Sequence, residues 1–315
     1  MTLRLGVIMD PISSINTAKD TTLAMLLEAQ ARGYELRYME QSDISIQAGT
    51  SHCTSRALTV RDDKTNWFDL SDEQEHELHR LDVILMRKDP PFDMEYIYTT
   101  YALELAEQQG CLVVNKPQSL RDVSEKAFIS WFPQCCANTL ISRDPKQIRA
   151  FIEEQQEAVV KPLDGMGGES VFRTSATDPN KNVIIETVSR NARRTVMAQK
   201  FIPEISSGDK RILLINGVPV PYALARIPAD GESRGNLAAG GSGKGVELSD
   251  RDKWICAQVG PELIKRGLLF VGIDVIGDYL TEVNVTSPTC VRQLDAIYNI
   301  NISAMLFDAI EQKLA

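Results

Sequence analysis

The sequence has no long hydrophobic run. Its apolar stretches, such as residues 83–86 and 111–114, are far shorter than the roughly 20 residues that a membrane helix needs. The first residues also lack the basic and apolar regions of a secretory signal. We therefore expect a cytoplasmic protein that does not enter a membrane.

Cysteine pairs and basic stripes are missing as well. The 6 cysteines form no Cys-x-x-Cys pair, which argues against both a disulfide framework and a zinc site. The formal net charge is −9, and no basic stripe offsets it. We therefore expect no nucleic-acid partner, because binding to phosphate backbones depends on such a stripe.

Several common catalytic motifs are absent. The only Gly-Lys step, Gly243-Lys244, precedes Gly245, so it is not a Walker A loop. Met9-Asp10-Pro11 stands where a dinucleotide-binding protein carries its glycine fingerprint. The 3 histidines all fall in the weakly patterned segment 42–79, and there is no Gly-x-Ser-x-Gly elbow. Phosphoryl transfer, which needs only positioned charge and a metal, is compatible with what remains.

The hydrophobic pattern predicts a first unit of strands separated by helices. Strands are expected at 3–9, 82–87 and 111–115, with helices at 22–32 and 94–109. This alternation predicts a parallel sheet with right-handed crossovers. Segment 42–79 is predicted to depart from this alternation as a β excursion, that is, as added β structure with a loop.

The rest of the chain is predicted to be richer in strands. A helix from 117 to about 131 leads into a strand at 139–141, a helix at 144–155 and a strand at 158–162. Further strands are expected at 196–202, 211–216, 220–226, 270–276 and 280–285, with a helix at 249–266. The glycine-rich stretch 227–245 is long for a structureless loop, so it is either functional or disordered.

A lysine followed by a glycine-rich turn gives the strongest local signal. Lys161 ends a strand, and Gly165, Gly167 and Gly168 follow before the next strand at 171–174. Glycines let backbone N–H groups converge on an anion, and the lysine adds a charge for phosphate. A β-hairpin with a flexible tip explains the glycines equally well on this segment alone.

Two acidic strands form the second signal. Glu282 and Asn284 are two residues apart and share one face of a strand. Asp274 joins that face only if it pairs with Glu282, which requires an odd number of turn residues, such as a three-residue loop with a bulge within 277–279. Three oxygen ligands would then suit magnesium. The alternative is an exposed polar face on a two-stranded ribbon.

Four cations form the third signal: Lys126, Arg211, Arg226 and Arg234. They lie at strand ends or within the glycine-rich stretch. Arginines bind carboxylates and phosphates through two parallel hydrogen bonds. Each of these side chains alone is more typical of a charge on the protein surface than of a ligand-binding residue. Their placement together favours a shared functional role.

Taken together, these residues resemble the ATP-grasp superfamily in order and spacing. Lys126, Lys161 with its glycine loop, residues 197–202, Asp274 and Glu282-x-Asn284 carry the likeness. More narrowly, six runs resemble bacterial glutathione synthetases: MDP at 9–11, MRKDPPFD at 86–93, NKPQSLRD at 115–122, KPLDGMGG at 161–168, RGNLAAGG at 234–241 and TEVNVTSPT at 281–289. The likeness covers nearly the whole chain, with segment 42–79 matching poorly.

The resemblance implies a fold that combines α/β and α+β parts. An N-terminal parallel α/β domain (1–122) would precede an ATP-grasp fold, made of a small central lid domain (123–202) and a larger antiparallel-sheet domain (203–315). It also implies a homo-oligomer, as a tetramer. The implied reaction joins γ-glutamylcysteine and glycine to glutathione, with ATP converted to ADP and phosphate through an acyl phosphate.

The resemblance also implies roles for individual residues. ATP would be held by Lys126, Lys161, Gly165, Met166, Gly167, Gly168, Gln199, Lys200, Phe201, Ile202 and Asp209. Of these, the backbone around Gln199–Ile202 would meet adenine and Asp209 would meet the ribose. Asp274, Glu282 and Asn284 would bind Mg²⁺, with Mn²⁺ as an alternative. Arg211, Arg226 and Arg234 would act on the acyl phosphate, with Arg234 on a closing loop, and Ser287 and Thr289 would touch the peptide substrate.

Other readings stay open at this point. Another ATP-grasp carboxylate–amine ligase, one that joins two D-alanines or adds glutamates to a protein tail, would share the nucleotide residues. An ATP-binding regulator without turnover would be expected to lack a metal ligand or a lid arginine, and this sequence has them all.

Overall fold

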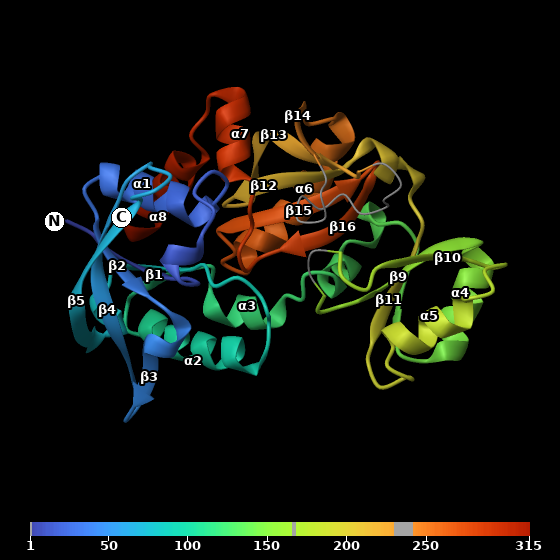
Figure 1. The fold of residues 1–315 in the computed structure, drawn as a ribbon, viewed down its shortest axis with the longest axis horizontal. Helices are drawn as coiled ribbons and strands as arrows, with labels where there is room; N and C mark the ends of the chain where they lie inside the picture. The colour runs from blue at the N-terminus through green and yellow to red at the C-terminus, as the bar shows by residue number, and fades with distance from the viewer. Residues whose placement is uncertain (1, 166–167, 230–241) are drawn as a thin grey trace.

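The computed structural model describes residues 2–165, 168–229 and 242–315. Within these residues the strands form three sheets, which follow one another along the long axis of the molecule (Figure 1). Both ends of the chain lie beside the first sheet. None of the helices in the described ranges is long and apolar enough to cross a membrane.

The first sheet is mixed. Its strand order is β3 (Ile44–Gln47), β4 (Thr50–Val60), β2 (Glu35–Met39), β1 (Arg4–Ile8), β6 (Val83–Met86) and β7 (Leu112–Val114), and β5 (Phe68–Glu77) pairs with β4. The run β2-β1-β6-β7 is parallel, as the alternation of strands and helices predicts. β3, β4 and β5 add an antiparallel extension, which confirms the β excursion at 42–79.

Capping residues fix where the first helices begin. The Asp20 side chain accepts a hydrogen bond from the Leu23 N–H at the start of α1 (Thr21–Ala31), and Asp93 does the same for Tyr96 in α2 (Met94–Gln108). Such caps satisfy N–H groups that have no partner within the helix. Both helices therefore start within a residue of the predicted positions.

The helix predicted from 117 to about 131 is wrong as a single element. Helix α3 (Pro117–Asp122) ends where Val123 turns extended, and a short 3-10 helix resumes at Ala127–Trp131. Between them, the Glu125 carbonyl accepts a hydrogen bond from the N–H of Val283, far along the chain. This long-range pairing takes the backbone out of the helical path.

The second sheet is small and antiparallel. Its order is β10 (Phe172–Ser175), β9 (Glu157–Pro162), β11 (Val196–Lys200) and β8 (Thr139–Ser142). Helices α4 (Pro145–Gln155) and α5 (Lys181–Val188) pack on it, and α5 was not predicted. Ile148, Ile152, Val160 and Ile185 share a core separate from the rest of the molecule.

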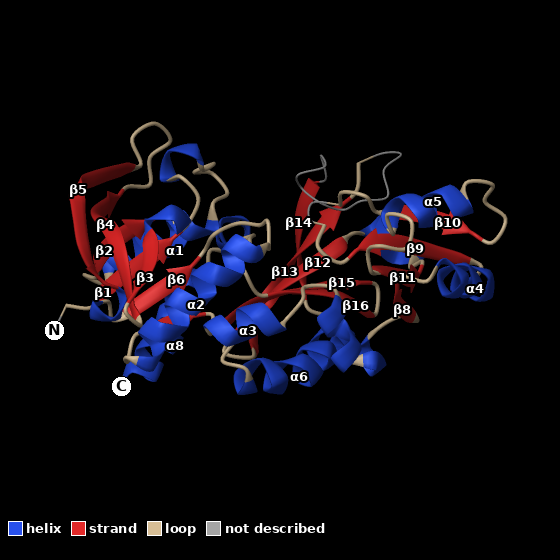
Figure 2. Ribbon diagram, turned by 90° about the horizontal axis from the view of Figure 1, so that it is seen from below, coloured by secondary structure: helices blue, strands red, loops and turns tan. Residues whose placement is uncertain are grey.

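The third sheet has the order β14 (Ser242–Glu247), β13 (Val218–Ile227), β12 (Asp209–Ile215), β15 (Phe270–Ile276) and β16 (Tyr279–Asn284), all antiparallel. Helix α6 (Asp250–Lys265) covers one face (Figure 2). The stretch 227–245 is not wholly without structure, because β13 reaches Ile227 and β14 begins at Ser242. The expected closing loop itself, 230–241, lies outside the described residues.

The last two helices, α7 (Val291–Tyr298) and α8 (Ile302–Leu314), bring the chain back to its beginning. Arg32, which ends α1, forms ion pairs with Asp308 and Glu311 of α8. Tyr34 meets the Phe307 ring edge-on. The C-terminal helix is thus part of the N-terminal core, while the division at 122 and 202 stays a prediction.

Candidate active site

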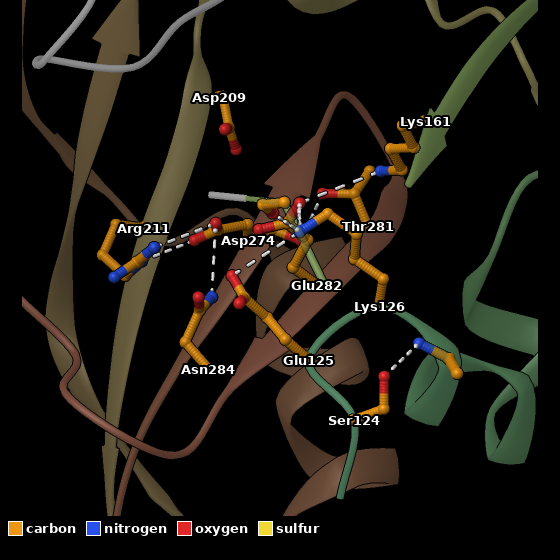
Figure 3. A network of polar contacts seen from close by, with 12 residues as sticks. Ser124, Glu125, Lys126, Lys161, Asp209, Arg211, Asp274, Thr281, Glu282 and Asn284 are labelled. Carbon is orange, nitrogen blue, oxygen red and sulfur yellow. Dashed lines mark hydrogen bonds and ion pairs between the residues drawn. The ribbon is translucent and has the colours of Figure 1, made fainter. Parts of the chain in front are cut away.

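A cavity of about 610 Å³ lies between the three sheets. All of the predicted site residues in the described ranges line it, although they come from segments far apart in the sequence. The predicted Met166, Gly167 and Arg234 fall outside those ranges. One face of β12, β13, β15 and β16 forms the charged floor of the cavity (Figure 3).

The predicted pairing of Asp274 with Glu282 is confirmed, but the turn is different. Ile276 pairs with Tyr279, so the turn has two residues, and the odd residue is Thr281, which is a bulge within β16. A bulge places two residues of one strand opposite one of the other and so corrects the side-chain alternation. The Thr281 hydroxyl donates a hydrogen bond to the Asp274 carbonyl at 3.1 Å.

Asp274 is held by two arginines from neighbouring strands. Arg211 lies directly opposite it on β12 and donates to its carboxylate from Nε and from Nη2, the latter at 3.0 Å. Arg226 Nη2 lies 2.8 Å from the same carboxylate and 2.6 Å from Asp209. Burial alone would raise the pKa of Asp274, but the two arginines hold that pKa well below its usual range.

Glu282 is held by two lysines instead. Its Oε1 lies 3.3 Å from Lys126 Nζ and 3.9 Å from Lys161 Nζ. Burial opposes ionisation, yet these cations lower the pKa of Glu282. Lys126 also donates to the Gly165 carbonyl at 2.7 Å, so it ties the glycine turn to the acidic strand.

Glu125 was not identified from the sequence. Burial and the nearby Glu282 charge raise the pKa of its carboxyl to about 8. Without a metal, repulsion between Asp274 and Glu282 would be expected to keep a proton on one of them. That expectation is wrong, because nearby cations lower the pKa of both carboxyls, and the raised pKa is found at Glu125 instead.

The donor set suits a hard cation. The side chains of Asp274, Glu282 and Asn284 share one face, and the Asn284 amide N–H donates to Asp274 at 3.3 Å, which turns its oxygen away from that carboxylate. Among the described residues, no group of three or more His, Cys, Asp or Glu is arranged to hold a metal. Two carboxylates, an amide oxygen and substrate phosphates are what magnesium accepts.

The other end of the cavity is less charged. The predicted adenine residues Gln199–Ile202 line it together with Val159, Val171, Ile205 and Ile276. The Gln199 side chain is buried and donates to the Thr139 hydroxyl at 3.0 Å. Arg173 lies over the Phe201 ring at 3.8 Å from its centroid. An apolar slot of this kind accommodates a flat heterocycle.

The wall facing the N-terminal sheet contains further residues that the sequence patterns did not single out. Ser287 and Thr289, which were predicted, lie there with Arg87, Thr22 and Gln293. The Ser287 hydroxyl donates to the Arg87 carbonyl at 3.4 Å. Arg87 itself lies in the run 86–93 that resembles the family, but the sequence assigned it no function.

Structural comparison defines the class. The chain superposes on D-cycloserine synthetase with a TM-score of 0.67 at 13% identity, covering 99% of this chain and 100% of the other. It also matches D-alanyl-alanine synthetase A from Vibrio cholerae, with a TM-score of 0.61 at 14% identity and coverage of 99% and 98%. At such identities the likeness concerns the fold alone, which is the ATP-grasp fold predicted from the sequence.

Sequence comparison identifies the family. Residues 3–121 match the family described as "Prokaryotic glutathione synthetase, N-terminal domain", and residues 125–299 match its ATP-grasp domain. The glutathione synthetase of Pseudomonas putida is 59% identical over 314 residues (100% of this chain, 99% of that protein), and that of Shewanella oneidensis is 57% identical over 312 residues (99% of each). The chain belongs to the prokaryotic glutathione synthetase family, as predicted.

Proposed function

We propose that this protein synthesises glutathione in the cavity between its three sheets. ATP activates γ-glutamylcysteine, and glycine then forms the peptide bond. The observation that carries this assignment is a pair of linked ion-pair clusters along the cavity, in which Lys126 and Lys161 contact Glu282 and Arg211 and Arg226 contact Asp274. This arrangement offers separate cations to a triphosphate and to a substrate carboxylate, with acidic groups for a metal between them.

Lys126 and Lys161 would bind the phosphates. Both are buried, and each already lies beside Glu282. Burial lowers the pKa of Lys161, a cost that a phosphate partner would remove. The turn at 165–168, including Met166 and Gly167, would cover the phosphates with its backbone N–H groups.

Asp274, Glu282 and Asn284 would hold Mg²⁺, which Mn²⁺ could replace. Bound there, the metal would neutralise charge on the phosphate oxygens. Asp209 Oδ1 is buried and has no hydrogen-bond partner among the described residues, and burial raises the pKa of this carboxyl to about 6. A ribose hydroxyl would satisfy that oxygen, in line with the role implied for Asp209.

Arg211 and Arg226 would stabilise the reacting carboxylate. An oxygen of the cysteinyl carboxylate attacks the γ-phosphorus, the bond to ADP breaks, and an acyl phosphate forms. The glycine amine then attacks the acyl carbon, phosphate leaves, and the amine loses a proton. Arg226 Nε is buried and has no hydrogen-bond partner within the part of the chain that the structure describes, so it can donate a hydrogen bond as charge develops.

Arg234, in the stretch 230–241, would close over the acyl phosphate and exclude water. We also propose a cytoplasmic location and a homotetramer, both on the basis of the family resemblance. Light scattering on the purified protein tests the assembly, because a monomeric mass at micromolar concentration contradicts it.

A coupled assay of ADP release tests the function. The expected result is rapid release with γ-glutamylcysteine and glycine together, and little release with ATP alone. Mass spectrometry should then show glutathione. Release driven by D-alanine or glutamate, but not by γ-glutamylcysteine with glycine, would overturn the assignment.

A further inference from the structure

Arg87 is a buried arginine that forms no ion pair with a carboxylate among the described residues. It follows β6, is 5% exposed, and lines the cavity on the side of the N-terminal sheet. Its Nε donates to the Thr22 hydroxyl at 3.2 Å and its Nη2 to the Pro288 carbonyl at 2.9 Å. Its Nη1 is buried without a hydrogen-bond partner in the described structure.

Two other buried arginines that line the cavity do have a carboxylate partner. Arg211 and Arg226 both form ion pairs with Asp274. Among the described residues, Arg87 contacts a hydroxyl, a carbonyl and the face of the Phe270 ring, 5.7 Å from its centroid, and burial lowers its pKa to about 10. A buried charge without a counter-ion is costly for the folded state. A cation kept at a cavity wall in this way is suited to an anionic group on a ligand.

The surroundings of Arg87 add acceptors for a positive group. The acidic residues whose charges act on Arg87 are Asp20 and Asp89, and both line the same part of the cavity. Gln293 of α7 also lines it, and its Oε1 is buried and accepts no hydrogen bond from the residues described. The Thr21 hydroxyl accepts from the Val291 N–H at 3.3 Å, which fixes α7 against α1. A cation beside several hydrogen-bond acceptors is complementary to the α-carboxylate and the α-ammonium group of an amino acid.

We propose that Arg87 binds the α-carboxylate of the γ-glutamyl residue of the dipeptide substrate, while Gln293 and Asp89 accept hydrogen bonds from its α-ammonium group. This assignment rests on the function proposed above. It makes the wall around Arg87 the determinant that recognises a γ-linked glutamate at the end remote from the reacting carboxylate.

Glycine also has a carboxylate, but its amine must reach the acyl carbon. That carbon lies, on the function proposed here, beside Arg211 and Arg226, whose charge partner is Asp274. The carboxylates whose charges act on Arg87 are instead Asp20 and Asp89, on the wall that faces the N-terminal sheet. The two carboxylates of γ-glutamylcysteine stand at opposite ends of the molecule, so one can occupy each region.

The test combines a variant with altered substrates. Arg87→Met keeps most of the side-chain volume and removes the charge, and Arg121→Met is the control, since Arg121 is half-buried and pairs with Glu104 away from the cavity. We expect Arg87→Met to raise KM for γ-glutamylcysteine roughly 10- to 100-fold, the range for a lost charged hydrogen bond. KM for glycine and for ATP should stay within about 2-fold of wild type, as should all three constants in the control.

Two substrate analogues test the same contact from the ligand side. 4-Aminobutyryl-cysteine lacks the α-carboxylate, and glutaryl-cysteine lacks the α-ammonium. Wild type should use 4-aminobutyryl-cysteine poorly, and Arg87→Met should use it about as well as γ-glutamylcysteine, because the partner of the missing carboxylate is then gone too. Arg87→Lys should recover part of the affinity.

A rise in the glycine KM of Arg87→Met without a rise for the dipeptide overturns the assignment. So does equal use of γ-glutamylcysteine and 4-aminobutyryl-cysteine by wild type, a measurement that stands even if the variant does not fold. Failure of the proposed function would look different, since wild type would then release no ADP with γ-glutamylcysteine and glycine.

Discussion

Asp274 lies directly opposite Glu282 on the paired strands β15 and β16, because Thr281 bulges out of β16 just before Glu282. The two carboxylates therefore face the same side of the sheet. Each has its own pair of cations, arginines for Asp274 and lysines for Glu282. Figure 3 shows Arg211 beside Asp274 and the two lysines near Glu282. Both carboxylates are thus compensated by cations before any ligand arrives, and the cations are in excess, so replacing one charge has predictable effects.

Glu282→Gln should impair metal use far more than folding. The substitution keeps the shape but removes one carboxylate ligand and the counter-charge of Lys126 and Lys161. We expect kcat to fall roughly 100-fold or more and the Mg²⁺ concentration for half-maximal ADP release to rise. Glu262→Gln on α6, which removes the partner of Arg266 outside the cavity, is the control. An unchanged Mg²⁺ titration would remove Glu282 from the metal site.

Lys161→Met should weaken ATP binding. The side chain is buried at the end of β9, and Met replaces its apolar stem while removing the phosphate partner. We expect the affinity for ATP to fall about 10- to 100-fold, as judged by equilibrium titration with a non-hydrolysable analogue. Lys181→Met, at the ion pair with Glu153 on the second sheet, should bind normally. Wild-type affinity in a folded Lys161→Met protein contradicts the assigned role.

Gly260→Ala should destabilise the protein although Ala favours helices. Gly260 lies within α6, where an added Cβ would meet the carbonyl oxygen of Gly217 in the turn between β12 and β13. We expect the free energy of unfolding to fall by about 1–3 kcal/mol, as for other overpacked sites. Gln258→Ala, exposed on the same helix, should be nearly neutral. Urea denaturation of both variants checks this, and a more stable Gly260→Ala protein would show that the helix can move away.

Stability should decrease below about pH 6.5 partly through His76. Burial lowers the pKa of His76 in the folded state from its ordinary 6.5, and its Nε2 lies 2.7 Å from the Ser55 hydroxyl. The unfolded chain then binds the proton more readily, so this contribution to stability is complete above about pH 6.5 and is lost as the pH falls toward the folded pKa.

His76→Gln should flatten that dependence. Its melting temperature should fall less than that of wild type between about pH 7.5 and about pH 5.5, whatever its stability at neutral pH. His52→Gln serves as the control on the neighbouring strand β4. Parallel melting curves for wild type and His76→Gln across this range would show that His76 does not contribute.

Much of the fold and most residues of the candidate site could be predicted from the sequence. Hydrophobic periodicity depends on near neighbours in the chain, so the first helices and the parallel strands were predictable. Glu282 and Asn284 were placed on one face by their spacing alone. The motif resemblance added the family, which the comparisons confirm, and the residue roles, which remain to be tested.

Tertiary structure decided what depends on contacts between distant segments. The bulge at Thr281, rather than the turn, brings Asp274 opposite Glu282, and the bond from Val283 to the Glu125 carbonyl interrupts the predicted helix. Arg87 is an ordinary arginine in the sequence. Only the packing of Thr22, Pro288 and Gln293 around the cavity leaves it buried without a counter-ion, because burial and charge balance are properties of the assembled chain and not of any one segment.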